Sequence, residues 1–280
     1  MKGEPGGRGS TRVRGERSEP GGRGSTWVLH VAADLDEVNR HWADLSAADM
    51  LGAAEVDGGT DVYFPRRVAD LALTGAWEEI PDRDWHTRWR EGLTPVRAGR
   101  WTVTPPWHAT GAIDELVIDP GQAFGTGHHE TTVACLRALD ETALEGRRVL
   151  DLGTGTAVLA IAAARRGARV VAVDIDPLAI DAARANAARN DVPIDARLGG
   201  IEAVDGERFD VVVANLDSAT LTRLAVGLAG ALSDAGELIA SGVGNPRAAQ
   251  VAGALRAAGL ETVTTIGDEW ALLRARREVA

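Results

Sequence analysis

VLDLGTGTA, from Val149 to Ala157, is an apolar run that enters a glycine-rich turn, and it decides the fold class of the 280-residue chain. The next apolar run, RVVAVD, ends at Asp174, 21 positions after Gly153. A buried strand, a glycine turn that opens a helix and an acid at the end of the next strand form the nucleoside-binding half of a doubly wound sheet. Gly153 and Gly155 let the backbone approach a ligand without a Cβ in the way. These features predict a nucleoside-type cofactor whose ribose hydroxyls hydrogen-bond to Asp174.

The spacing of the turn separates the candidate cofactors. A dinucleotide fingerprint has a third glycine three positions after the second, where Val158 stands in this chain. The turn also lacks the lysine of a triphosphate-binding loop. Its Gly-x-Gly-x-Ala spacing resembles that of S-adenosylmethionine-dependent methyltransferases, whose cofactor has no phosphates to neutralise. A turn that serves packing alone is the alternative, and the position of Asp174 disfavours it.

Length and composition indicate one large domain and one small one. No stretch approaches the roughly 20 apolar residues that span a bilayer, and the N-terminus has no apolar segment typical of a secretory signal. Cys135 is the single cysteine, which excludes an internal disulfide and a cysteine-based zinc site. We therefore expect a cytoplasmic protein that does not associate with membranes.

Residues 1–26 contain EPGGRGST twice and have no apolar periodicity. They predict a disordered Gly/Arg-rich tail, with an arm that touches RNA as the alternative. Six basic and three acidic side chains give this tail a net charge of +3, which leaves −14 for the rest of a chain whose net charge is −11. An acidic body repels nucleic acid and attracts a basic partner, so we expect no direct nucleic-acid binding.

Residues 27–80 are predicted to form a small ferredoxin-like α+β domain. WVLHVAA is typical of a strand, the segment after it has helical periodicity, and Gly58-Gly59 joins two strand-like runs into a hairpin. Residues 81–93 predict a charged connector helix with Trp85 and Trp89 on one face.

Residues 94–280 are predicted to form the larger domain. Apolar strand-like runs alternate with amphipathic helices, which predicts an α/β, doubly wound, mostly parallel seven-stranded sheet covered on both faces. The last two strand-like runs, ETVTTI and EWALLRAR, flank Gly267-Asp268 and predict a hairpin that adds one antiparallel strand.

The chain resembles the ribosomal protein L11 methyltransferases (PrmA) from Trp27 to its end. The matching segments, in order, are WVLHV, AWEEIPDRDW, TPPWH, IDPGQAFGTGHHETT, VLDLGTGTAVLAIAAA, VAVDIDPLAI, VVVANL and EWALLRAR. FGTGHHETT, ahead of the glycine turn, is specific to this group and its close relatives. The resemblance implies an enzyme that transfers methyl groups from S-adenosylmethionine to amino groups, on a lysine or the N-terminus, of a basic large-subunit ribosomal protein. It also implies that the small domain recognises this substrate. We expect the enzyme to be a monomer.

The resemblance assigns site residues by position. The implied cofactor contacts are Thr132, Gly153, Gly155, Asp174 and Asn215, and the implied lid-like loop over the methionine end contains Phe124, Thr126 and Gly127. The sequence departs from the family at Ala157, where a third glycine is common, and in the repeated tail, which has no counterpart.

Asn215 is the expected catalytic residue, in a positioning role without a firm general base. Methyl transfer from a sulfonium is an in-line displacement, so the enzyme mainly aligns the reacting atoms. A lysine amine, with a pKa of about 10.4, must first lose its proton through burial or to water. The side-chain carbonyl of Asn215 can orient such an amine. Leu216 and Asp217 follow it, so the NPPY-type motif for exocyclic base nitrogens is missing.

His128, His129 and Glu130 suggest a metal site or an acid–base pair, but adjacent side chains diverge and no further histidine or cysteine cluster is near. We expect no metal and a positional role for His129 and Glu130. Cys135 is expected to be a core thiol. The alternative functions are methylation of another protein or a small molecule, and cofactor binding without catalysis.

Overall fold

The computed structural model describes residues 25–277 except 34–36, 39–40, 42–43, 46–47, 57, 82–92, 121–126 and 128. The chain divides into two compact units, Met1–Gly92 and Leu93–Ala280, and each is described by itself. The predicted connector helix lies outside the described residues, as does the predicted tail except for its last two residues. No helix of the described part is both long and apolar enough to cross a membrane.

The first unit contains a four-stranded antiparallel sheet with the order β2-β3-β1-β4. Its strands are β1 (Ser25–Val31), β2 (Gly52–Val56), β3 (Gly59–Phe64) and β4 (Ala76–Pro81). The predicted hairpin joins β2 to β3, and Gly58 takes a positive φ of 92° at its turn. β1 starts two residues before the predicted start of the small domain at Trp27, and Thr26 is already buried in the sheet. The ferredoxin-like assignment of this unit stays a prediction.

The second unit is built on a seven-stranded sheet with the order β10-β9-β8-β11-β12-β14-β13. The strands are β8 (Arg148–Leu152), β9 (Arg169–Asp174), β10 (Asp195–Leu198), β11 (Phe209–Asn215), β12 (Leu232–Gly244), β13 (Leu260–Ile266) and β14 (Trp270–Arg277). β14 runs antiparallel to both of its neighbours, whereas the other pairs are parallel. The predicted mostly parallel sheet with a final hairpin is therefore confirmed.

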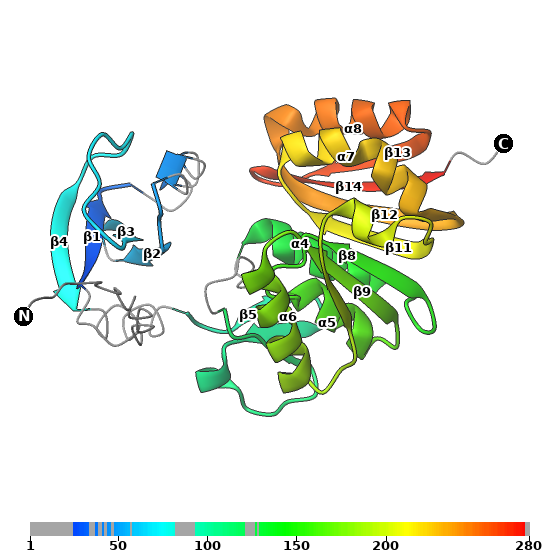
Figure 1. Ribbon diagram of the computed structural model, residues 1–280, viewed down its shortest axis with the longest axis horizontal. Helices are drawn as coiled ribbons and strands as arrows, with labels where there is room; N and C mark the ends of the chain where they lie inside the picture. Colours follow the sequence, from blue (N-terminus) through cyan, green and yellow to red (C-terminus); the bar gives the residue numbers. More distant parts are fainter. Residues whose placement is uncertain are drawn as a thin grey trace, which may run out of the picture. The chain divides into compact units, whose positions relative to one another are not determined.

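Helices cover both faces of this sheet (Figure 1). They are α4 (Glu130–Glu141), α5 (Val158–Arg165), α6 (Pro177–Arg189), α7 (Ser218–Ala231) and α8 (Ala248–Ala257). Successive residues of a strand face opposite sides of its sheet. In β11, Val211 and Val213 accordingly pack with residues of α4, α5 and α6, while Val212 and Ala214 pack with residues of α7 and α8.

A separate three-stranded sheet precedes α4. It contains β5 (Val96–Ala98), β6 (Trp101–Thr104) and β7 (Glu115–Val117), followed in the chain by the segment that leads to the glycine-rich residues 121–127. The sequence runs WTVTPPW and ELVIDP predict the strands β6 and β7, whereas β5 was not predicted. One-turn 3-10 helices lie at Pro106–His108, Ile201–Val204 and Asn245–Arg247.

Candidate cofactor site at the carboxyl ends of the strands

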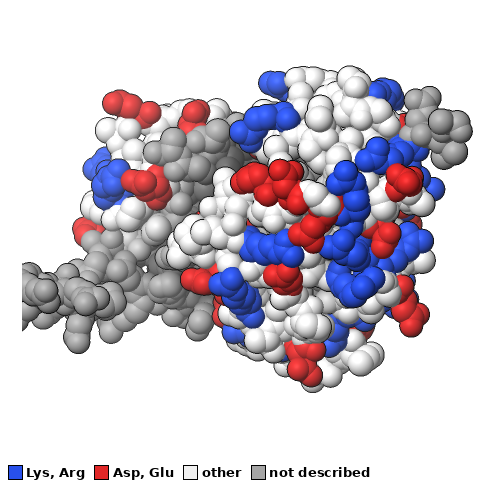
Figure 2. Space-filling view, turned by 45° about the vertical axis from the view of Figure 1, so that its right-hand side comes forward, with Lys and Arg blue, Asp and Glu red and all other residues white. Residues whose placement is uncertain are grey.

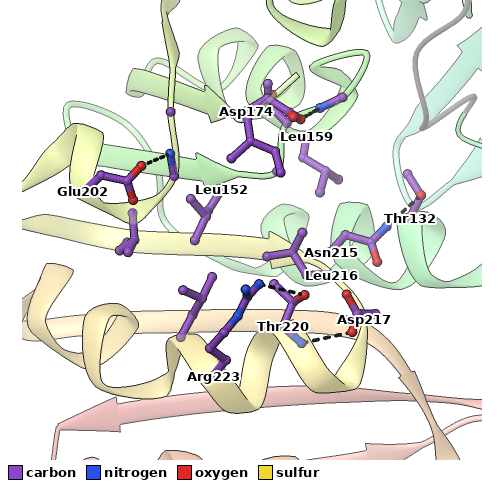
Figure 3. Close-up of a pocket in the computed structure, with 18 of the residues that line it drawn as sticks. Thr132, Leu152, Leu159, Asp174, Glu202, Asn215, Leu216, Asp217, Thr220 and Arg223 are labelled. Atoms are coloured by element: carbon purple, nitrogen blue, oxygen red, sulfur yellow. Dashed lines mark hydrogen bonds between the residues drawn. The ribbon is translucent and has the colours of Figure 1, made fainter. Parts of the chain in front are cut away.

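A cavity of about 540 Å³ opens at the ends of β8, β9 and β11, where parallel strands of a doubly wound sheet present their ligand site (Figure 3). Its lining includes five of the residues predicted from the sequence, namely Thr132, Gly153, Gly155, Asp174 and Asn215. These residues come from four separate stretches of the chain, and the winding of the sheet brings them together.

The glycine turn after β8 has an unusual backbone that the sequence allows. Gly153 and Gly155 have φ values of 75° and 53°, and Ala157 takes a left-handed φ of 66° at the start of α5. Val173 of the neighbouring strand accepts hydrogen bonds from the N–H groups of Gly153 (2.8 Å) and Thr154 (3.0 Å). A Cβ on Gly153 would stand 2.4 Å from Leu216 Cδ2, so a larger residue would have to displace that side chain in addition to adopting a positive φ.

Asp174 lies at the end of β9, beside this turn. Its Oδ2 accepts a hydrogen bond from the N–H of Gly155 at 2.9 Å, and its Oδ1 accepts one from the N–H of Asp176 at 3.0 Å. Each carboxylate oxygen has two lone pairs, so both can accept a further hydrogen bond from a ligand. The carboxylate is therefore held in place by backbone groups and can still bind a diol.

Asn215 ends β11 and points to α4. Its Nδ2 donates to Thr132 Oγ1 at 3.1 Å, which Figure 3 shows at one end of the cavity. In this orientation, Oδ1 is the acceptor that a second molecule can use. Asn215 pairs with Ser241 of β12, and the N–H of Leu216 donates to Ser241 O, so the backbone beneath the side chain is also fixed.

Gly127 is not among the residues that line this cavity. It is buried with a φ of 86°, and a Cβ on it would stand 2.6 Å from Val103 Cγ1 of β6. The structure therefore gives Gly127 a packing contact against the small sheet. Phe124 and Thr126, the other residues of the predicted lid-like loop, lie outside the described residues.

His129 and Glu130 have the positional roles expected from the sequence. His129 caps α4, its Nδ1 accepting from the N–H of Thr131 at 3.3 Å, and Glu130 lies in the first turn of that helix. The His129 ring also packs edge-on against Trp270, with 4.8 Å between the centroids. Within the described part of the chain, no group of histidine, cysteine and acidic residues could hold a metal ion.

Cys135 is a fully buried thiol on α4, as predicted. Burial raises the pKa of this thiol far above its usual value, and the negative charge of Asp151 raises it further. A thiol that does not ionise is a poor nucleophile. Cys135 therefore does not act as a catalytic nucleophile.

The residues on the far side of the cavity were not predicted from the sequence. Gly199 and Gly200 follow β10, and Glu202 Oε1 accepts from the N–H of Gly200 at 2.7 Å (Figure 3). Asp217 begins α7 and accepts from the N–H groups of Ala219 and Thr220. Burial alone would raise the pKa of Asp217, but these hydrogen bonds hold it below its usual range. The Gly-Gly pair directly after a predicted strand was the available signal.

Most of the remaining lining is apolar and suits a flat, uncharged ring, and Thr154, Thr220 and Arg223 add polar groups to it. The apolar side chains are Leu152, Val158, Leu159, Ile175, Ile201, Leu216 and Leu224. A mainly apolar cavity of this size, with a few polar groups that fix orientation, is typical of small-molecule sites. An adenosine group fits these features, because Asp174 can accept hydrogen bonds from ribose hydroxyls and the apolar side chains can contact the ring.

The order of the seven strands, the antiparallel β14 and the carboxylate beside the glycine turn define an S-adenosylmethionine-dependent methyltransferase. Within that class, the chain belongs to the ribosomal protein L11 methyltransferase (PrmA) family, whose model matches residues 63–278.

Similar proteins agree with this assignment. A ribosomal protein L11 methyltransferase of Thermus thermophilus is 40% identical over 250 residues, covering 88% of this chain and 98% of the relative. One from Deinococcus radiodurans is 40% identical over 272 residues, covering 90% and 99%. The crystal structure of a ribosomal protein L11 methylase from Lactobacillus delbrueckii subsp. bulgaricus superposes with a TM-score of 0.62 at 28% identity. It covers 67% of this chain and 100% of that structure.

Proposed function

We propose that this protein transfers methyl groups from S-adenosylmethionine to amino groups of ribosomal protein L11, on a lysine side chain, the N-terminus or both. The observation that carries the proposal is the placement of Asp174 and Asn215 in one cavity, together with the cofactor-type glycine turn that precedes both of them in the sequence. Family membership supports the choice of substrate.

The cofactor is held by groups already fixed in the structure. Asp174 would accept hydrogen bonds from the ribose hydroxyls, and the turn at Gly153 and Gly155 would let the ligand approach the backbone. The apolar side chains of the cavity would contact the adenine ring. When bound, S-adenosylmethionine supplies an electrophilic methyl group on a sulfonium.

The acceptor amine is positioned by Asn215. Its Nδ2 is already engaged with Thr132, so Oδ1 is directed to the substrate and accepts a hydrogen bond from the amine. An amine near this apolar cavity is desolvated, which lowers its pKa and favours the neutral, nucleophilic form. Water takes up the proton. Alignment is the main contribution of the chain, and effective molarities in well-aligned reactions are large.

The small unit, as a ferredoxin-like domain, recognises the ribosomal protein. The chain carries a net charge of −11, which favours association with a basic protein. Figure 2 shows basic and acidic side chains intermixed on the face of the larger unit that it draws, without a broad basic area of the kind that binds nucleic acid. We further propose a cytoplasmic monomer that acts on the protein without contacting RNA directly.

Labelling tests the substrate. The purified protein is incubated with methyl-labelled S-adenosylmethionine and, in separate reactions, with ribosomal proteins stripped of RNA, with ribosomal RNA, and with a small-molecule extract. Label is expected in one protein, identified by mass spectrometry as L11, and the modified amines are then mapped. The Asp174→Ala variant is the control for carry-over of labelled cofactor. Label in RNA or in the extract alone contradicts the proposal.

A further inference from the structure

Asn186, on α6, is a buried side chain whose hydrogen bonds link three parts of the larger unit. It is 1% exposed. Its Nδ2 donates to Asp119 O at 3.0 Å and to Thr156 O at 3.1 Å. Its Oδ1 accepts from the N–H of Asp119 at 2.9 Å and from Arg189 Nη1 at 2.8 Å. Both donor hydrogens and both acceptor sites of the amide are therefore used.

The contact with Thr156 reaches into the cofactor turn. Thr156 lies between Gly155 and Ala157, both of which have a positive φ. A left-handed alanine costs roughly 1–2 kcal/mol, so the turn needs support from its surroundings. Asp174 holds the turn at the N–H of Gly155, and Asn186 holds it at the carbonyl one residue later.

The contact with Asp119 connects the same turn to the segment after β7. Asn186 and Asn190, one helical turn apart, bind the backbone N–H and C=O of Asp119 and Val117. In a β-sheet, a neighbouring strand forms hydrogen bonds with the backbone N–H and C=O of alternate residues. The side-chain amides of Asn186 and Asn190 therefore take the place of a neighbouring strand along this segment. Asn186 is the member of the pair that also binds the glycine turn.

We propose that Asn186 is a positioning residue for the cofactor, which sets the conformation of the glycine turn through the Thr156 carbonyl and ties it to the segment at Asp119. This inference rests on the proposed function in one respect, because the expected change in affinity requires that the cavity binds S-adenosylmethionine.

Asn190 provides a matched control. It is 5% exposed, its Oδ1 accepts from the N–H of Val117 at 2.9 Å, and its Nδ2 donates to Val117 O at 2.7 Å and to Asn186 O at 2.8 Å. Asn190→Asp and Asn186→Asp each keep the acceptor and remove the donors, with the same change of charge. Only Asn186→Asp removes a hydrogen bond from the glycine turn, and its new carboxylate lies beside Arg189, which already donates to Oδ1.

Two measurements on the full chain test the proposal. In calorimetric titration with S-adenosylhomocysteine, Asn186→Asp is expected to raise Kd by roughly 5- to 30-fold, the range expected for one or two lost hydrogen bonds, and Asn190→Asp by less than about twofold. Thermal melts should show similar drops in Tm for the two variants. Equal effects on Kd, or an unchanged Kd in Asn186→Asp, overturn the proposal.

Amide hydrogen exchange on the ligand-free protein gives a readout that needs no cofactor. Peptides covering residues 153–158 should exchange faster in Asn186→Asp than in Asn190→Asp. Wild-type protein that fails to bind S-adenosylhomocysteine contradicts the proposed function, and exchange then still decides whether Asn186 positions the turn. Equal exchange in the two variants overturns the positioning role.

Discussion

Asp174 Oδ2 accepts a hydrogen bond from the N–H of Gly155 at 2.9 Å, so the carboxylate that ends β9 also holds the turn that follows β8. The two strands are parallel neighbours, with Leu152 paired to Val173. Their ends therefore place the turn and the acid side by side before any ligand arrives. A site organised in advance loses less free energy to ordering when it binds.

Replacement of Asp174 tests the cofactor assignment. Asp174→Ala removes the acceptor for the ribose diol, and hydrogen bonds to a charged group contribute about 1.5–3 kcal/mol. We expect affinity for S-adenosylmethionine to fall by roughly 10- to 150-fold in calorimetry. Asp181→Ala, at an exposed position of α6, is the control and should bind normally. An unchanged affinity in folded Asp174→Ala contradicts the assignment.

Replacement of Asn215 should lower kcat more than it lowers stability, because the side chain lines the cavity at the carboxyl end of β11. Asn215→Ala is expected to lower kcat by about 100-fold, since a misplaced acceptor can cost that much. Thr132→Val removes the partner of Asn215 Nδ2 but keeps Asn215 itself, so it should lower kcat less. Both kcat and Tm are measured on the identified substrate. Turnover near that of the wild type would remove Asn215 from the mechanism.

The division of labour between the two units is tested by shortening the chain. Removal of residues 1–24, which precede β1, should change neither stability nor activity. A protein of residues 93–280 keeps the seven-stranded sheet and should still bind cofactor. Its methylation of L11 should fall by a large factor, because docking supplies the effective concentration of the amine. Full activity of the shorter protein would favour a small-molecule acceptor.

Asp151 makes stability depend on pH in an unusual direction. Burial raises its pKa from 3.8 to about 7, even though Thr154 and the N–H of Ala160 donate to Oδ2, and the charge of Asp174 adds to the rise. Its Oδ1 is buried without a hydrogen-bond partner in the described part of the chain. The folded state thus holds a proton that the unfolded chain releases, and this contribution to stability declines as pH rises from about 4 to about 7.

Asp151→Asn cannot titrate, so comparison with the wild type isolates this contribution. We compare the free energy of unfolding of Asp151→Asn minus that of the wild type. This difference should increase by an amount on the order of 2–4 kcal/mol as the pH rises from about 4 to about 7, and it should stay constant at higher pH. Urea denaturation at several pH values measures the difference. A difference that does not change with pH would show that Asp151 ionises normally.

Ala157 should accept glycine at little cost, unlike most buried alanines. The left-handed φ of 66° costs alanine roughly 1–2 kcal/mol, which glycine avoids. Loss of a buried methyl and the greater entropy of the unfolded glycine each oppose this by about 0.5–1 kcal/mol. We expect Ala157→Gly to change the free energy of unfolding by less than about 1 kcal/mol. Gly153→Ala should destabilise more, and the reverse order in urea denaturation contradicts the strain argument.

The sequence by itself determined the local elements and the chemistry of the cofactor turn. Alternation along β11 and the spacing of the two glycines act over a few residues, so they can be recognised without knowing the fold. The acid at the end of β9 is visible in the same way. Asp174, Asn215 and Thr132 were predicted, and the structure brings them to one cavity.

Only the tertiary structure decided which distant residues support that cavity. Asn186 binds Thr156 and Asp119 across sequence separations of 30 and 67 residues, and no local pattern marks it among the other residues of α6. Gly127 had the appearance of a ligand-loop glycine, yet it packs on Val103. Such contacts depend on how the sheet winds and which helix covers which strand. Their energies come from burial and hydrogen bonding between segments, which no short stretch of sequence contains.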